Sequence, residues 1–123
     1  MANVLVIDDE QNILDFLSVR IKAMGHTPVR AANCAEGLLA MDNPSIQVII
    51  ADIYLPDSPG PGAWIDQLIT RAKNRPVILI TGFPSQELTA KLKEVTVTAL
   101  LTKPFELAFL DELIAKIIGS HPT

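Results

Sequence analysis

Five polar side chains in this 123-residue sequence combine residue types that suit one kind of chemistry. Asp8 and Asp9 follow one apolar run, Asp52 follows another, and Thr81 and Lys103 follow two more. Three neighbouring carboxylates repel one another and need a cation, and an all-oxygen ligand set suits Mg²⁺. A lysine offers its charge, and a threonine its hydroxyl, to a phosphoryl oxygen. The set therefore predicts a carboxylate nucleophile, Asp52, that attacks phosphorus and becomes an aspartyl phosphate.

These side chains meet only if the apolar runs are strands of one sheet. Short β-branched runs alternate with amphipathic segments along the chain. The pattern predicts strands at 3–7, 27–31, 46–51, 77–80 and 99–102, and helices at 10–24, 33–41, 62–71, 85–93 and 107–118. This alternation predicts an α/β fold whose parallel sheet is covered by helices on both faces. Ligands of such sheets bind at the carboxyl ends of the strands, where the five polar side chains stand.

Composition excludes several classes of protein. A hydrophobic share of 49% with 20% charged residues rules out a disordered chain, and the length predicts one domain. No apolar run approaches the ~18–20 residues of a membrane span, and we expect a cytoplasmic protein without membrane contact. The single cysteine, Cys34, excludes an internal disulfide and a cysteine-rich zinc site. The net charge of −4 disfavours direct contact with nucleic acid.

Three residues that could carry other chemistry have plainer interpretations. We expect Cys34 to be a small, partly buried packing residue, although it stands near a helix start. His26 lacks a partner at metal-ligand spacing and is predicted to lie at the surface. Trp64 is predicted to pack the third helix against the sheet.

Four segments, in order, resemble the receiver domain of two-component response regulators. They are Val4–Glu10, Asp52–Pro56, Leu79–Gly82 and Leu101–Phe105. Each is common by chance, but all four at successive strand ends are specific, and the resemblance covers the whole chain. It implies a flavodoxin-like (βα)5 doubly wound sandwich with a five-stranded parallel sheet of order 2-1-3-4-5. It also implies a receiver domain over residues 1–119, with a frayed tail at 120–123.

The resemblance assigns roles around the phosphoacceptor. Asp52 is expected to take a phosphoryl group from a phosphohistidine on a histidine kinase or a phosphotransfer protein. Asp9, Asp52 and the backbone carbonyl of Tyr54 are expected to ligate Mg²⁺ directly, while Asp8 acts mainly through water. Lys103 is expected to pair with the phosphoryl group.

The resemblance also identifies residues of a switch. Pro104 is expected to follow a cis peptide bond. In the usual scheme the threonine, here Thr81, moves toward the phosphoryl group while an aromatic ring three residues before the lysine turns inward. That position holds Leu100, which has no large ring, so a ring-rotamer switch is not expected.

The leading hypothesis is therefore a signalling module that catalyses only its own phosphorylation and dephosphorylation. Phosphorylation would switch a surface read by an output domain or a target protein, or used for a phosphorylation-dependent homodimer. An alternative is a Mg²⁺-dependent phosphatase or phosphotransferase with an aspartyl-phosphate intermediate, but such enzymes usually carry an acid where this chain has Tyr54. A flavodoxin-like nucleotide or flavin binder would need a Ser-, Thr- or Gly-rich first turn rather than Asp8-Asp9-Glu10.

Overall fold

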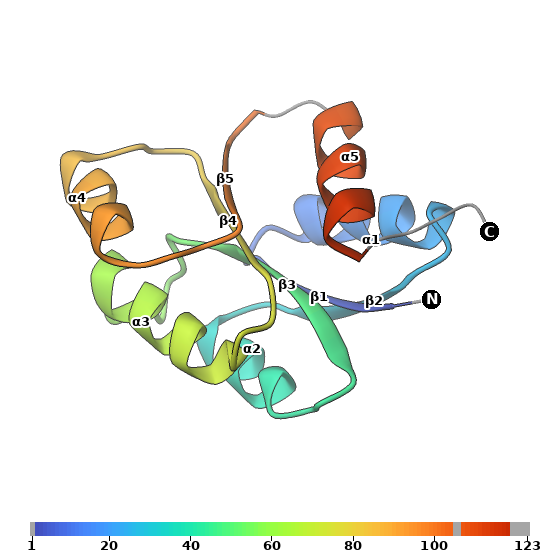
Figure 1. Cartoon of the computed structure of the whole chain (residues 1–123), viewed down its shortest axis with the longest axis horizontal. Helices are drawn as coiled ribbons and strands as arrows, with labels where there is room; N and C mark the ends of the chain where they lie inside the picture. The colour runs from blue at the N-terminus through green and yellow to red at the C-terminus, as the bar shows by residue number, and fades with distance from the viewer. Residues whose placement is uncertain (1, 105–106, 119–123) are drawn as a thin grey trace.

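The computed structural model describes residues 2–104 and 107–118, and these form one parallel sheet between two layers of helices (Figure 1). The strands are β1 (Asn3–Ile7), β2 (Thr27–Ala31), β3 (Ile46–Asp52), β4 (Val77–Thr81) and β5 (Ala99–Thr102). The helices are α1 (Gln11–Ala23), α2 (Cys34–Met41), α3 (Pro61–Ala72), α4 (Gln86–Glu94) and α5 (Leu107–Ile118). Phe105 of the fourth motif and the predicted tail at 120–123 lie outside the described residues.

The strand order is β2-β1-β3-β4-β5 and every neighbouring pair is parallel. This confirms the predicted flavodoxin-like fold. Because β1 and β3 are central, their residues are buried on both faces, which explains their continuous apolar runs.

Two hydrophobic cores lie on opposite faces of the sheet. Leu5 and Ile7 of β1 face the core that α2, α3 and α4 cover. Val4 and Val6 face the core that α1 and α5 cover, in agreement with the two layers in Figure 1. Side chains alternate in this way because successive residues of a strand point to opposite faces of the sheet. Helices therefore cover both faces.

Local sequence signals set where the helices begin. The Asn33 side chain accepts a hydrogen bond from the Glu36 amide at 2.8 Å, and Ser85 does the same for Leu88 at 3.1 Å. Both are N-caps of the predicted kind. The third helix begins at Pro61, one residue before the predicted start, because proline suits the first helical position.

Two of the plainer interpretations are tested by burial. Cys34 is buried, and burial together with a hydrogen bond to Asp57 raises the pKa of its thiol to about 12, so the packing interpretation is confirmed. The prediction for His26 is wrong: its side chain is buried. The turn after α1 folds it against the start of β1, where its Nδ1 accepts a hydrogen bond from the Ala2 amide at 3.0 Å.

None of the helices in the described part of the chain is long and apolar enough to cross a membrane.

Candidate functional site

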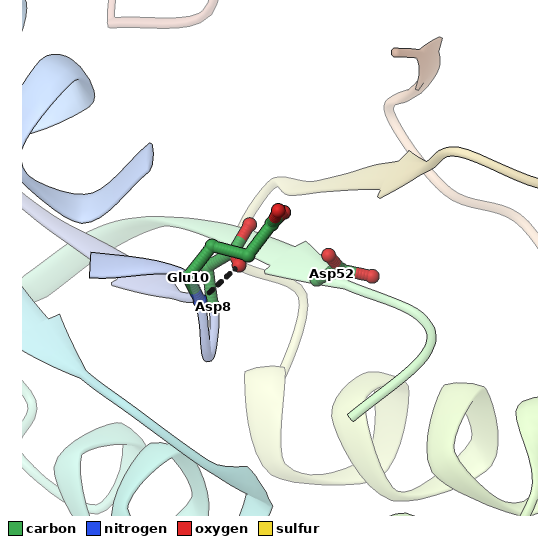
Figure 2. A group of neighbouring side chains, drawn as sticks. All are labelled: Asp8, Glu10 and Asp52. Carbon is green, nitrogen blue, oxygen red and sulfur yellow. Dashed lines mark hydrogen bonds between the residues drawn. The ribbon is translucent and has the colours of Figure 1, made fainter. Parts of the chain in front are cut away.

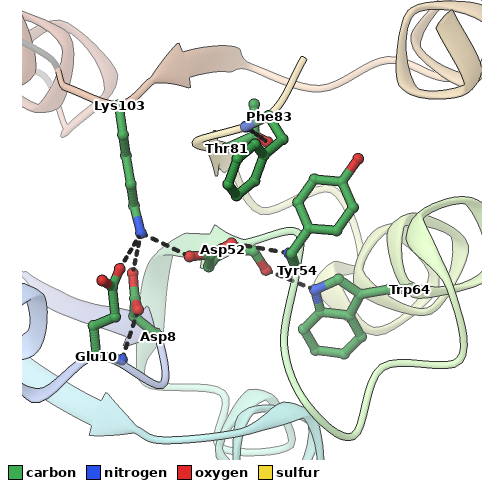
Figure 3. Close-up of polar contacts among 8 residues, drawn as sticks. All are labelled: Asp8, Glu10, Asp52, Tyr54, Trp64, Thr81, Phe83 and Lys103. Atoms are coloured by element: carbon green, nitrogen blue, oxygen red, sulfur yellow. Dashed lines mark hydrogen bonds and ion pairs between the residues drawn. The ribbon is translucent and has the colours of Figure 1, made fainter. Parts of the chain in front are cut away.

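The polar side chains predicted to act together stand at the carboxyl edge of the sheet (Figure 3). Asp8 directly follows β1, and Asp52 is the last residue of β3. Thr81 is the last residue of β4, and Lys103 directly follows β5. Four neighbouring strands thus deliver one group each, as expected for a parallel sheet.

Lys103 links the site through three contacts (Figure 3). Its Nζ donates to Asp8 Oδ2 at 3.2 Å, to Glu10 Oε2 at 2.7 Å and to Asp52 Oδ2 at 2.8 Å. Burial opposes the charged form of the lysine, but hydrogen bonds and charges from these carboxylates outweigh it and raise the pKa of Lys103. The amine therefore stays protonated at any physiological pH.

Three carboxylates lie close together at this edge of the sheet (Figure 2). Single oxygens of Asp8, Glu10 and Asp52 all lie within 4.8 Å of one another. Asp8 and Asp52 are buried, whereas Glu10 is exposed. Burial, with a contribution from the Asp52 charge, raises the pKa of Asp8 to about 6 despite opposing hydrogen bonds. An oxygen-only group under this electrostatic pressure has the donor chemistry that Mg²⁺ prefers.

The three neighbouring carboxylates include one acid that the sequence-based ligand set did not name. Asp9 is exposed and is not part of the three-carboxylate group, whereas Glu10 is. The Glu10 amide donates to Asp8 Oδ1 at 2.9 Å, which turns the chain at the start of α1 and brings the Glu10 side chain toward Lys103. In the sequence, Glu10 could have been identified as a candidate because it is the third acid of the run Asp8-Asp9-Glu10.

Backbone and indole donors hold Asp52 on two sides. The Tyr54 amide donates to Asp52 Oδ1 at 2.9 Å, and the indole N–H of Trp64 donates to the Asp52 carbonyl oxygen at 2.9 Å. Trp64 is fully buried and packs α3 as predicted. Sequence reasoning missed its contact with Asp52, although a buried indole N–H normally finds an acceptor.

Thr81 is the last residue of β4, the strand next to the one that ends at Asp52. Its hydroxyl oxygen accepts a hydrogen bond from the Phe83 amide at 3.0 Å, and its carbonyl accepts one from the Lys103 amide at 2.8 Å. The rings of Phe83 and Tyr54 meet edge to face with centroids 6.2 Å apart (Figure 3). Both rings are exposed, so the site has an aromatic rim.

The two residues assigned to the switch lie in and after β5. Leu100 pairs with Leu79 of β4 and packs, partly buried, against the core on the α3 and α4 side. The peptide bond between Lys103 and Pro104 is cis, as expected.

Comparison with known proteins decides the class of this site. The family model for the response regulator receiver domain matches residues 4–116. The chain belongs to the response regulator receiver domain family. The receiver domain is a signalling domain rather than a classical enzyme, and its acidic cluster of Asp8, Glu10 and Asp52 fits Mg²⁺ and aspartate phosphorylation.

Relatives of this receiver domain are response regulators and their domains. An NtrX-like response regulator of Rickettsia felis is 30% identical over 104 residues, which cover 84% of this chain and 22% of that protein. The chain thus spans about a fifth of that relative's length. A receiver domain from Clostridium thermocellum is 26% identical, with a TM-score of 0.85 over 97% of this chain and 95% of that one.

A further solved structure shares the fold at lower identity. It is the receiver domain of a sensor histidine kinase from Pseudomonas aeruginosa, with 17% identity and a TM-score of 0.81 over 97% of this chain and 98% of that chain. That structure has a magnesium ion coordinated in its active-site cleft.

Proposed function

We propose that Asp52 is the phosphoacceptor of this receiver domain and that residues 1–119 form the working unit. The observation that carries the proposal is the position of the Asp52 carboxylate. It is buried at the end of a central strand, 2.8 Å from a lysine and beside two further carboxylates. A phosphoryl group on this oxygen would place new negative charge directly against Lys103.

The donor would be a phosphohistidine of a histidine kinase or a phosphotransfer protein. A carboxylate oxygen of Asp52 attacks phosphorus, the phosphorus–nitrogen bond breaks, and the imidazole leaves with its electron pair and is reprotonated. Lys103 balances the charge on the transferring oxygens. The Tyr54 amide holds Oδ1 of Asp52 in one orientation, and Thr81 offers a hydroxyl next to the acceptor strand.

The site fits a magnesium ion through oxygens of this chain. Asp9 and Asp52 would hold it directly, together with the Tyr54 carbonyl, while Asp8 would act mainly through water. The buried, mutually repelling carboxylates support this, as does the magnesium ion in the Pseudomonas aeruginosa receiver domain. When bound, Mg²⁺ supplies positive charge that neutralises the phosphoryl oxygens.

The domain would act on no separate metabolite and would catalyse only its own phosphorylation and dephosphorylation. The added dianion would bias a two-state surface formed by α4, β5 and α5. The reader of that surface would be an output domain, a target protein or a second phosphorylated copy of the chain. We expect no direct contact between this domain and nucleic acid, in line with the net charge of −4.

Intact mass after incubation with Mg²⁺ and acetyl phosphate tests the proposal. Wild type should gain the mass of one phosphoryl group, and only when Mg²⁺ is present. Asp52→Asn should gain none, since an amide oxygen is a poor nucleophile. If no adduct forms, binding of beryllofluoride with Mg²⁺ separates rapid hydrolysis from an inactive site. Failure of both in wild type overturns the proposal.

A further inference from the structure

The connection between β3 and α3, residues 53–60, is hydrogen-bonded to a helix that is distant in sequence. Asp57 makes these bonds: its Oδ1 accepts from the Cys34 amide at 2.9 Å, and its Oδ2 accepts from the Ala35 amide at 3.1 Å. The two amides are the first of α2 and lie 23 and 22 residues earlier in the chain. One carboxylate therefore holds the connection against the start of α2.

The first turn of α2 divides its amides between two acceptor residues. The first two amides donate to Asp57. The next two, of Glu36 and Gly37, donate to the side chain and the carbonyl of Asn33 at 2.8 and 3.0 Å. A carboxylate at this end of a helix is favoured by the helix dipole, and the hydrogen bond from the Cys34 amide is the main cause that lowers the pKa of Asp57. Asp57 is therefore ionised at physiological pH, and its hydrogen bonds are of the strong, charge-assisted kind.

The other contacts of the connection are of different kinds. At its start, the Ile53 amide continues the sheet by donating to the Ile80 carbonyl at 3.0 Å. Leu55 is buried in the core, but apolar packing has no preferred direction. Among the described residues, Asp57 is the only side chain of the connection that hydrogen-bonds a residue outside it. Tyr54 thus lies between a residue held by the sheet and a residue held by α2.

We propose that Asp57 is a positioning residue of the magnesium site: by holding residues 53–60 against α2, it keeps the Tyr54 backbone where the site needs it. The Tyr54 amide donates to Asp52 Oδ1 at 2.9 Å (Figure 3), and the Tyr54 carbonyl is the proposed magnesium ligand. The inference rests on the proposed function and adds to it a residue that touches neither the metal nor the phosphoryl group.

The competing explanation is that Asp57 only caps α2. Asn33 separates the two explanations, because it caps the same helix but its side-chain hydrogen bonds run to Glu36, within the helix. Loss of either cap should lower the free energy of unfolding by a similar amount, which urea unfolding measures. Only the loss of Asp57 should disturb the magnesium site.

A titration with Mg²⁺ alone gives the first readout. Binding is followed by the fluorescence of Trp64, the single tryptophan, which donates to the Asp52 carbonyl. Asp57→Ala should weaken Mg²⁺ binding by about three- to tenfold, at or below the low end of the loss expected when a partner that orients a metal ligand is removed. Asn33→Ala should bind Mg²⁺ as wild type does.

Asp57→Asn separates position from charge. Asparagine lacks the negative charge entirely but keeps one oxygen that can accept from an amide of α2. Its Mg²⁺ affinity should therefore lie between those of wild type and Asp57→Ala. If Asp57→Ala does not fold, Asp57→Asn takes its place in the comparison with Asn33→Ala.

Hydrogen exchange of the Tyr54 amide, followed by NMR in the metal-free domain, gives the second readout. Asp57→Ala should speed this exchange, because the amide should separate from Asp52 more often when the connection is not held by α2. Asn33→Ala should leave the exchange unchanged. The measurement needs neither metal nor phosphoryl donor, so its result does not depend on the proposed function.

The outcomes divide cleanly. Weaker Mg²⁺ binding and faster Tyr54 exchange in the Asp57 variants alone support the proposal. Equal effects of Asp57→Ala and Asn33→Ala overturn it, and so does unchanged exchange at Tyr54. An Asp57→Asn variant that binds Mg²⁺ as weakly as Asp57→Ala also overturns it, because charge alone then explains the loss. Failure of wild type to bind Mg²⁺ or to take up a phosphoryl group would instead count against the proposed function, while the exchange data would still decide the role of Asp57.

Discussion

Asp8 holds a negative charge in a buried position where that charge is costly to the fold. Its pKa is raised to about 6, mainly by burial and partly by Asp52, so the folded state favours the protonated acid more than the unfolded state does. The resulting stability is fully present below the ordinary value of 3.8 and is lost as the pH rises through about 6. In the absence of metal, the protein therefore carries an unfavourable ionised group at neutral pH.

We predict that Asp8→Asn stabilises the metal-free domain at neutral pH. The free energy of unfolding should rise by on the order of 1–3 kcal/mol, because the amide removes the charge but can still accept from the Glu10 amide. Urea unfolding in the presence of a chelator measures this. The gain should shrink below about pH 6, as wild type takes up its own proton, and a gain that is independent of pH would contradict this explanation.

Ser18 presents a buried polar atom of a different kind. It lies in the middle of α1, is 6% exposed, and its hydroxyl has no hydrogen-bond partner among the described residues. Alanine removes the unsatisfied group and has the higher helix propensity. Ser18→Ala should therefore raise the free energy of unfolding by about 1 kcal/mol. Thermal unfolding checks this, and a loss of stability would show that an ordered water satisfies the hydroxyl.

Single residues also show where sequence reasoning succeeds and where it stops. Asp8, Asp52 and Lys103 were predictable because strand ends of a parallel sheet must share one edge. The choice between Asp9 and Glu10 beside the lysine depends on the exact turn of the chain at the start of α1, which spacing alone does not determine. The prediction for His26 was wrong because the lack of a partner at metal-ligand spacing does not determine burial, which here follows from tertiary packing.

At the scale of elements, the predicted helices and strands agree with the structure to within a residue or two. Strong local signals explain this: β-branched runs for strands, Asn33 and Ser85 as caps, and Gly25 after α1 with a φ of 88°. Local signals could not predict the side-chain contacts that hold one element against another. These come from long side chains whose partners lie far away in sequence.

Arg75 is the clearest example of a residue that makes such contacts. Its guanidinium donates five hydrogen bonds to backbone carbonyls, at distances of 2.6–3.2 Å. The acceptors belong to the end of α2, the connection that follows it, the start of β3 and the end of α3, and they are Met41, Asn43, Ile46, Arg71 and Ala72. All five donors of the side chain are therefore used, at the edge of the sheet opposite to the functional site.

We predict that Arg75→Lys lowers the free energy of unfolding by about 1–3 kcal/mol, since an ammonium cannot reproduce the fork and leaves carbonyls without donors. Arg71→Lys is the matched control. Arg71 makes only two side-chain contacts among the described residues, both exposed, with Leu38 at 3.3 Å and Asp42 at 3.2 Å, so their loss should cost under about 0.5 kcal/mol. Urea unfolding compares the two, and equal effects would refute the special role of Arg75. Phosphorylation by acetyl phosphate should be unaffected in both variants.

For the whole molecule, the sheet separates two buried titratable groups that respond to acid in opposite ways. Asp8 stands after the carboxyl end of β1, and His26 contacts its amino end. Acid relieves the cost of the Asp8 charge. At His26, burial and the positive charge of the amino terminus lower the pKa below the ordinary 6.5. The stability from a neutral His26 is therefore present above pH 6.5 and is lost as the pH falls below it.

Comparison with His26→Asn isolates the second effect, because Asp8 titrates equally in both proteins. An asparagine oxygen can still accept from the Ala2 amide but takes up no proton. The free energy of unfolding of wild type relative to that of His26→Asn should decrease as the pH falls from about 7.5 to about 5. Urea unfolding with a chelator at several pH values gives the difference directly. A difference that stays constant toward acid would mean that folding leaves the pKa of His26 unchanged, and one that grows would mean that folding raises it. Either result would contradict this explanation.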